Sequence, residues 1–247
     1  MARLKSGELR TPHAETFLSR TLFSIVAIIG LCLQSGNVAA QAYESRSNAR
    51  LSQLQAKVNQ LYEDGKHERA YLIYRDELAA AGDKYAQYMI GYMTMRGESV
   101  EQDPITASAW YRLAAERGTP QFVMVRDEVL ATFDSAQRQE SDSSFLQLRK
   151  QYGDVALLLE QVRIDLKNFA TAPGPAAKVG STPSVIVDRR TGLLFSADYY
   201  QKIRERLRTR LSMLARLTRI ENFPTDPDEL EFSDIEPQVS AWLDRLE

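Results

Sequence analysis

The chain has 247 residues, a formal net charge of −2, two histidines and one cysteine. This length allows one large domain or two small ones. The near-neutral charge gives no overall basic footprint, so nucleic acid is not expected as a partner. So few histidine and cysteine residues argue against Cys/His zinc sites and Cys–His nucleophile pairs.

Residues 1–42 have the pattern of a secretory signal peptide. Four basic residues, the last of them Arg20, precede the 12-residue apolar run from Leu22 to Leu33, and small residues follow up to Ala42. A transmembrane helix needs roughly 20 apolar residues, so this run is short for a permanent span. We expect export to the periplasm or the medium with cleavage after Ala40 or Ala42; an uncleaved anchor is the alternative.

Removal of this leader would also remove Cys32 and His13, which leaves no thiol for a disulfide and His67 as the last histidine. His67 stands between Lys66 and Glu68 and is expected in an exposed polar turn. Neighbouring acidic pairs such as Asp76-Glu77 point in different directions on a helix and do not form a glycosidase pair. We therefore expect no catalysis, no metal site and no cofactor.

Residues 48–133 show apolar positions at spacings of three and four, in runs that end at glycine. Gly65, Gly82 and Gly118 are expected to end helices, and Asp103 with Pro104 is expected to cap and begin one. Gly82 and Gly118 are 36 residues apart, and in that register Tyr74 matches Trp110. A period of this length with two helices per unit is typical of a helical solenoid.

Within the stretch Ser108–Gly118, alanines flank two large aromatic residues. Small residues at helix crossings allow a close approach, and the aromatic residues fill the space between layers. Including this stretch, residues 86–118 resemble one Sel-one-like repeat, a relative of the tetratricopeptide repeats. The matching residues are Ala86, Ile90, Gly91, Gly97, Val100, Asp103, Ala107, Trp110, Tyr111, Ala114, Ala115 and Gly118.

Three departures from the repeat pattern are plain: Thr94 stands where the family usually has tyrosine, Ser99 where it often has glycine, and Phe122 where the next unit would open with a small residue. Gly65, Ala70 and Tyr74 look like a preceding half-unit. The resemblance implies a short right-handed α-α solenoid over residues 43–133 and a role in protein–protein assembly.

The segment 134–169 is expected to be one long amphipathic helix that caps the solenoid. From Phe145 to Phe169 it carries an unbroken apolar stripe at heptad spacing. A homodimeric coiled coil through residues 145–169 is the alternative.

Residues 170–183 contain three prolines and two glycines and are expected to be a linker. The C-terminal module, 184–247, is expected to contain a β-hairpin around Asp188–Gly192, a basic helix over 199–219 and an acidic tail. Asp226, Pro227 and Glu229 predict the start of a helix in that tail. The tail lacks the spacing of a calcium loop.

Two surfaces are candidates for binding. Tyr85, Tyr88 and Tyr92 lie at spacings of three and four on one helix that ends near Arg96; these residues could line a partner-binding groove, and core packing explains the tyrosines equally simply. The basic helix, with Lys202, Arg206 and Arg210, could bind an anionic surface, or it could be solvated or neutralised by the acidic tail. The expected function is a non-catalytic adaptor of the bacterial envelope that binds an unidentified protein; the alternative is a membrane-surface or cell-wall binding protein.

Overall fold

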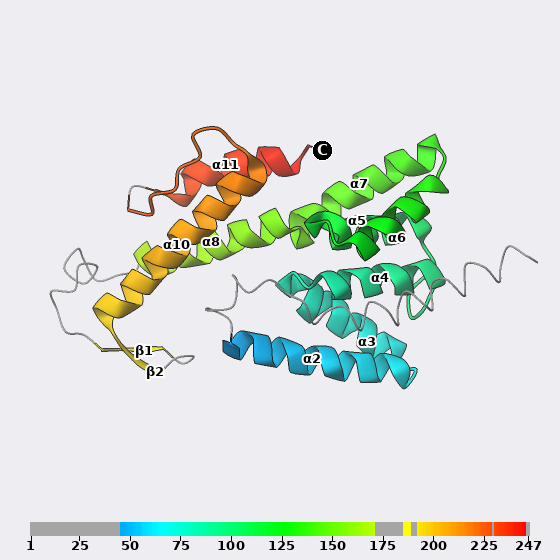
Figure 1. The fold of residues 1–247 in the computed structure, drawn as a ribbon, viewed down its shortest axis with the longest axis horizontal. Helices are drawn as coiled ribbons and strands as arrows, with labels where there is room; N and C mark the ends of the chain where they lie inside the picture. The colour runs from blue at the N-terminus through cyan, green and yellow to red at the C-terminus, as the bar shows by residue number, and fades with distance from the viewer. Residues whose placement is uncertain (1–44, 171–184, 189–191, 229, 246–247) are drawn as a thin grey trace, which may run out of the picture. The chain divides into compact units, whose positions relative to one another are not determined.

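The computed structural model describes residues 45–170, 185–188, 192–228 and 230–245 (Figure 1). Two compact units are distinguished, Met1–Gln53 and Leu54–Glu247, and the following description concerns the second. The predicted signal peptide with its cleavage sites, and all of the predicted linker beyond Ala170, lie outside the described residues.

The main body is all-α, as the sequence predicts. The α-helices are α2 (Ser45–Glu63), α3 (His67–Ile73), α4 (Lys84–Arg96), α5 (Pro104–Ala114), α6 (Pro120–Ala131), α7 (Ser135–Tyr152), α8 (Asp154–Ala170), α10 (Ser196–Thr218) and α11 (Phe232–Leu243). Short π and 3-10 segments, η2 (Tyr74–Leu78) and η3 (Ala79–Ala81), extend α3, and η4 (Ala115–Arg117) extends α5. Two strands, β1 (Val185–Asp188) and β2 (Gly192–Phe195), pair antiparallel.

The predicted helix boundaries in the first half are confirmed. Gly65, Gly82 and Gly118 have positive φ angles, as does Gly97. At Gly97, with φ of 70°, the backbone turns so that the N–H groups of Gly97 and Glu98 bond to the last carbonyls of α4. Asp103 accepts hydrogen bonds from the backbone N–H groups of Ile105 and Thr106 at 2.9 and 3.0 Å, which caps α5.

The alanines beside Trp110 and Tyr111 lie where helices press together, since Ala109, Ala114 and Ala115 are all buried. Gly91 of α4 shows how close the approach is: a Cβ there would lie 2.9 Å from the Tyr111 ring and 3.1 Å from the Ala107 carbonyl oxygen. α4 and α5 therefore form a tightly packed helical hairpin.

α7 packs on the other side of α5. The Ser108 and Ser141 hydroxyls are 2.7 Å apart and buried, and the Trp110 and Tyr152 rings are 4.8 Å apart. Arg112 pairs with Asp142 at 2.6 Å near the same contact. α7 thus packs on α5, and its role as the cap of a solenoid stays a prediction.

The prediction of one unbroken helix over 134–169 is wrong, because the chain breaks at Gly153. This residue is extended, with φ of −69° and ψ of 150°, and separates α7 from α8. A Cβ at this position would lie 2.5 Å from the Arg149 carbonyl oxygen. The helix also begins at Ser135, capped by Asp134 through a capping box with Gln137.

A cluster of charged side chains joins the start of α8 to the helical hairpin of α4 and α5. The buried Lys84 ammonium lies 2.7 Å from a Glu116 carboxylate oxygen and 3.1 Å from one of Asp154. Arg117 forms a two-point ion pair with Asp154, both contacts at 2.9 Å, and also donates to the Gly82 carbonyl. These four side chains link the start of α4, the end of α5 and the start of α8.

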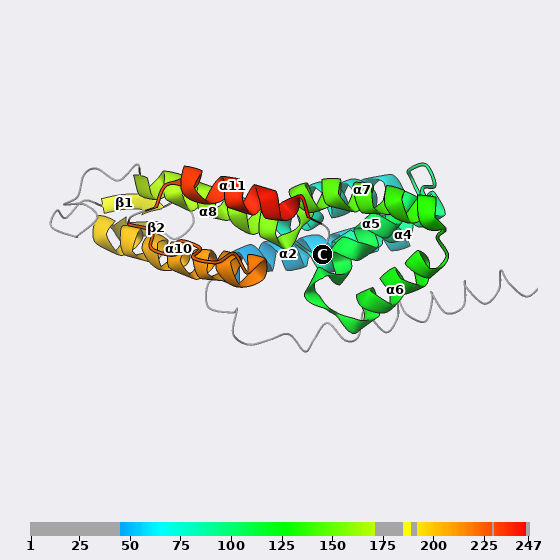
Figure 2. The same cartoon turned by 90° about the horizontal axis from the view of Figure 1, so that it is seen from above.

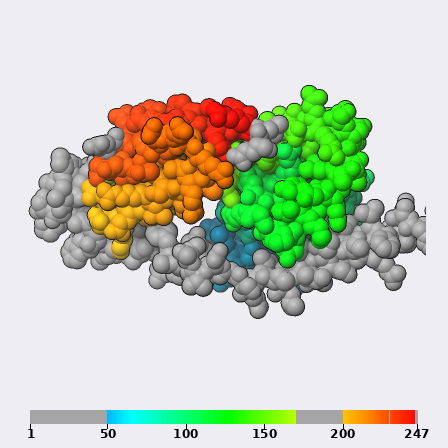
Figure 3. All heavy atoms as spheres, turned by 45° about the horizontal axis from the view of Figure 1, so that its top comes forward, coloured from blue at the N-terminus to red at the C-terminus, as the bar shows by residue number. Residues whose placement is uncertain are grey.

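The remaining helices form a three-helix bundle, in which α10 and α11 run alongside α8 (Figure 2). Its core uses the predicted stripe of α8, from Val155 to Phe169, and the predicted face of α10, which includes Ile203, Leu207, Leu211 and Leu214. Figure 3 shows α10 (yellow to orange) and α11 (red) packed against each other. The heptad stripe of α8 is therefore covered within the chain.

The predicted helix start at Asp226 and Pro227 is wrong, and Glu229 lies outside the described residues. Asp226 accepts a hydrogen bond from the Asp228 N–H in a turn. α11 instead begins after Glu231, whose side chain and that of Asp234 form a capping box. The capping residue that the structure shows, Glu231, comes five residues after the predicted one, Asp226.

Candidate functional site

The tyrosine row on α4 lies mostly inside the fold. Tyr88 is fully buried, Tyr92 is 8% exposed and Tyr85 is half-buried, while Arg96 at the end of the helix is exposed. The Tyr88 ring stacks on Phe122 of α6 at 5.5 Å and meets Tyr111 of α5 at 5.6 Å. Tyr88 and Tyr92 are therefore core residues, and core packing is the second of the two explanations offered for their spacing.

The Tyr88 hydroxyl is buried and has no hydrogen-bond partner among the described residues. Burial raises the pKa of Tyr88 above the ordinary range of a tyrosine. An unsatisfied buried hydroxyl costs about 1–3 kcal/mol. The partner-binding role of this row stays a prediction, and it would require Tyr88 to be uncovered.

Arg96 lies at the edge of the row, with half of its side-chain surface exposed. Its guanidinium lies 5.5 Å from the centre of the Tyr92 ring, and its Nε lies 2.7 Å from a Glu98 carboxylate oxygen. The Tyr62 hydroxyl donates to the other oxygen of Glu98 at 2.7 Å. Glu98 therefore links Arg96 at the end of α4 to Tyr62 of α2.

The basic helix is partly neutralised within the chain. Arg206 pairs with Asp165 of α8 at 2.9 Å, and Arg210 pairs with the same carboxylate, whose side chain is 5% exposed. Arg204 pairs with Asp228 of the acidic tail at 3.1 Å. Neutralisation of the basic helix by the acidic tail is one of the predicted alternatives, and the Arg204–Asp228 pair agrees with it. The pairing of Arg206 and Arg210 with Asp165 was not predicted, because charge patterns along the sequence do not show which distant residues meet.

Lys202, the third predicted surface-binding residue, is exposed. It lies one helical turn before Arg206 on α10. The three predicted residues therefore share one side of the helix, with two of them anchored on α8.

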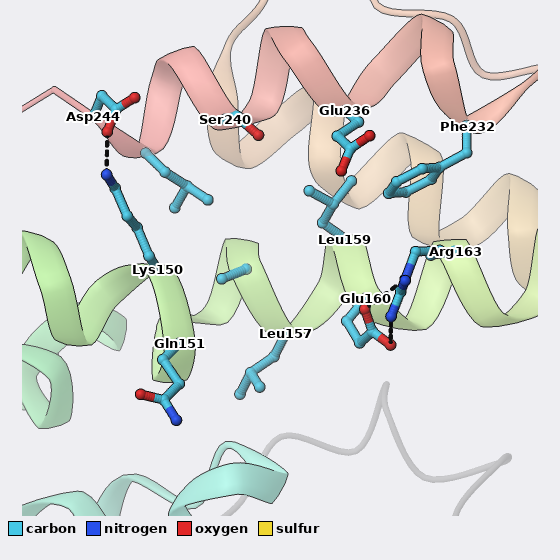
Figure 4. A pocket seen from close by; sticks show the side chains of 12 residues that line it. Lys150, Gln151, Leu157, Leu159, Glu160, Arg163, Phe232, Glu236, Ser240 and Asp244 are labelled. Carbon is cyan, nitrogen blue, oxygen red and sulfur yellow. Dashed lines mark hydrogen bonds and ion pairs between the residues drawn. The ribbon is translucent and has the colours of Figure 1, made fainter.

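A groove that the sequence does not predict lies between α8 and α11 (Figure 4). Its volume is about 580 Å³. Leu159 of α8 points toward Phe232 and Glu236 of α11 in Figure 4, and Ala156 and Leu243 add further apolar lining.

Ion pairs stand at the two ends of this groove. Lys150 of α7 pairs with Asp244 at one end, and Arg163 pairs with Glu160 at 2.8 Å at the other. Glu236 lines the groove and forms no ion pair with any described residue. The groove therefore combines an apolar floor with charged ends and one unpaired carboxylate.

The described residues contain no group of three or more His, Cys, Asp or Glu residues positioned to hold a metal ion. His67 stacks on the Tyr62 ring at 4.8 Å and is half-buried.

Within the described part of the chain, no helix has the length and apolar character that crossing a membrane requires.

Comparisons with protein-family models, with curated proteins and with solved structures found no match.

Proposed function

We propose that the chain is a non-catalytic adaptor that binds an amphipathic helix of a partner protein in the groove between α8 and α11. The observation that carries this proposal is the open groove, whose lining combines apolar side chains with polar and charged ones and has ion pairs at its two ends. Its wall on α11, from Phe232 to Asp244, is about 18 Å long, which corresponds to more than three turns of helix.

A helix fits these walls better than an extended strand. Both walls are α-helices, whose backbone groups are already bonded within the helix, so a strand would find no ladder to join. Binding must then come from side chains that pack on the apolar floor. Such contacts, repeated at spacings of three and four, are typical of a helix in a groove.

The charges describe the partner further. Lys150 and Arg163 face Glu160, Glu236 and Asp244, so two cations and three carboxylates leave one negative charge. Because carboxylates outnumber cations along the groove, the bound helix should carry a basic side chain near Glu236. The contact contributes more to orientation than to affinity.

The helices that precede α7 are proposed to form a short right-handed solenoid of the Sel-one-like type, to which the three-helix bundle of α8, α10 and α11 is joined. Two details support this. Ser99, which stands at a frequent glycine position of the family, has a positive φ of 69°. Gly91 lies where any side chain would meet the Tyr111 ring. Both fit a backbone shaped for the repeat pattern.

The adaptor is proposed to act in the bacterial envelope, on the strength of the signal-peptide pattern in residues 1–42. The intact mass of protein purified from the envelope tests this directly. Export with cleavage predicts a first residue of Gln41 or Tyr43. A mass that includes Met1 would indicate the uncleaved form.

The groove is tested with Ser240→Arg, which places a long side chain among the lining residues at an exposed position of α11. Ser212→Arg, at an exposed serine of α10, is the matched control. Partners are captured with tagged wild-type protein, and a synthetic peptide covering each partner's amphipathic helix is titrated by calorimetry. We expect Ser240→Arg to weaken peptide binding at least tenfold and Ser212→Arg to leave it unchanged.

Two outcomes would contradict the proposal. Equal binding of the peptide by wild type and Ser240→Arg would place the contact elsewhere. A homodimer in sedimentation that Ser240→Arg dissociates would make a second copy of the chain the occupant.

A further inference from the structure

A second surface follows α10 and shares no residue with the groove. Lys202, Arg206, Arg210, Met213 and Leu217 succeed one another at steps of three or four, which places them on one side of the helix. This stripe lies next to the buried stripe that α10 turns to the bundle core. It therefore faces outward along most of the helix.

The stripe is basic. Lys202 and Arg216, one turn beyond Met213, are exposed, and Arg206 and Arg210 are each 20% exposed at the side chain. Among the described side chains of this face, the carboxylates are the largely covered Asp165 and the exposed Glu205, which accepts a hydrogen bond from Gln201. The exposed cations Lys202 and Arg216 form no ion pair with any described residue.

Exposed apolar side chains border the cations. Met213 is 38% exposed and Leu217 is 40% exposed. Ile164 of α8 is 42% exposed and lies one turn from Gln161, whose backbone and side-chain oxygens accept hydrogen bonds from Arg210. Large apolar and basic side chains are thus interleaved across α8 and α10.

We propose that this face of α10, with Ile164 of α8, binds the surface of an anionic lipid bilayer. Arginine and lysine side chains would contact the phosphate groups, and the three apolar side chains would enter the boundary between headgroups and acyl chains. An acidic protein surface would satisfy the cations, but it would leave Ile164, Met213 and Leu217 unexplained. A bilayer surface accounts for both kinds of residue.

The ion pairs with Asp165 suit this role. One buried carboxylate holds two guanidinium groups in place, so the arginines lose less side-chain freedom when they bind. The exposed Lys202 and Arg216 then supply the cations that lie farther from Asp165 along the helix.

The test is co-sedimentation of the purified full-length chain with two kinds of vesicle. One kind is phosphatidylcholine alone, and the other contains equal parts of phosphatidylcholine and phosphatidylglycerol. The difference between them measures the part of the binding that depends on lipid charge. Because the basic residues before Leu22–Leu33, such as Arg20, also favour anionic lipid, variants of α10 are needed to assign the binding to this face. We expect binding to the anionic vesicles that falls as salt is added.

Variants identify the surface. Each cation at an anionic membrane contributes about a fivefold change in affinity. The double variant Lys202→Glu with Arg216→Glu should therefore lose roughly tenfold or more. Met213→Ser with Leu217→Ser should also weaken binding, by at least about threefold.

The control reverses two exposed lysines elsewhere, Lys57→Glu with Lys66→Glu, and changes the net charge by the same amount. It should bind as the wild type does. Equal binding to both kinds of vesicle, no binding to either, or an equal loss in the control would each overturn the proposal. Circular dichroism of every variant checks that helicity is unchanged.

Discussion

Two buried tyrosines differ in what their hydroxyl groups contact. Tyr74 donates to the Asn59 side chain at 2.8 Å, whereas the Tyr88 hydroxyl has no partner. Both rings are at most 1% exposed. The same substitution should therefore have opposite effects at the two positions.

We expect Tyr74→Phe to lower the free energy of unfolding by about 1 kcal/mol, because a made hydrogen bond is lost. Tyr88→Phe should leave it unchanged or raise it by about 1 kcal/mol, because an unsatisfied group is removed. Urea unfolding measures both. A loss at Tyr88→Phe as large as that at Tyr74→Phe would show that the Tyr88 hydroxyl has a partner in solution.

Ser99 holds a backbone conformation that glycine adopts without strain. Its φ of 69° is unfavourable for a residue with a Cβ by about 1 kcal/mol. Ser99→Gly should raise the free energy of unfolding by roughly 0.5 kcal/mol after the extra freedom of glycine in the unfolded chain is counted. Ser143→Gly, at an exposed position inside α7, should lower it by about 0.5–1 kcal/mol. Equal losses at both positions would rule out the left-handed conformation at Ser99.

Local signals were readable from the sequence where one residue type has one strong preference. The glycine stops and the Asp103 cap are of this kind. The tyrosine row was ambiguous for a physical reason: a spacing of three and four places side chains on one face, but it does not say whether another helix covers that face. Phe122 of α6, which stacks on Tyr88, decides the outcome.

At the scale of elements, the break between α7 and α8 shows what periodicity conceals. The apolar stripe continues from Tyr152 to Val155 across Gly153, so the heptad pattern gives no sign of an interruption. A single glycine within a helical pattern is tolerated, because it costs only about 1 kcal/mol relative to alanine. The sign that a break occurs is the close approach of the Arg149 carbonyl, which only the structure provides.

Gly153→Ala is expected to destabilise the fold by about 1–3 kcal/mol, since its Cβ would lie 2.5 Å from the Arg149 carbonyl oxygen. Gly65→Asn is the control, because space around Gly65 is open and asparagine tolerates a positive φ. Thermal unfolding compares the two. If Gly153→Ala is as stable as the control, α7 and α8 form a continuous helix in solution.

Asp154 connects the charged cluster to acid stability. Burial acts to raise its pKa, but the hydrogen bonds and charges of Arg117 and Lys84 prevail and hold the pKa of Asp154 below its ordinary value of 3.8. A carboxyl with a lowered folded pKa stabilises the fold fully above the unfolded pKa. That stability is lost as the pH falls through the folded pKa.

We therefore expect the wild-type protein to lose stability more steeply than Asp154→Asn as the pH falls below about 4. Urea unfolding at a series of pH values gives the two slopes. A general effect of removing one negative charge would appear equally in Asp127→Asn, at an exposed position of α6. Parallel slopes for wild type and Asp154→Asn would contradict the role of Asp154.

At the scale of the whole molecule, the sequence predicted the helical hairpin of α4 and α5 and the buried faces of α8 and α10. It did not predict the groove between α8 and α11. The groove depends on where α11 lies, and the start of that helix was placed five residues too early because Asp226 and Pro227 carry a strong capping pattern. Contacts such as Arg210 with Asp165, 45 residues apart, are equally invisible in local patterns.

The most direct test of the proposed function compares two surfaces in one experiment. A photoreactive amino acid is placed at Ser240, which lines the groove, and separately at Tyr85, the half-buried member of the tyrosine row. Both proteins are crosslinked in intact envelopes, and the crosslinked partner peptides are identified by mass spectrometry. The groove account predicts crosslinks from Ser240 to an amphipathic helix of a partner, and none to that helix from Tyr85. Crosslinks from Tyr85 alone would contradict it and return the binding site to α4.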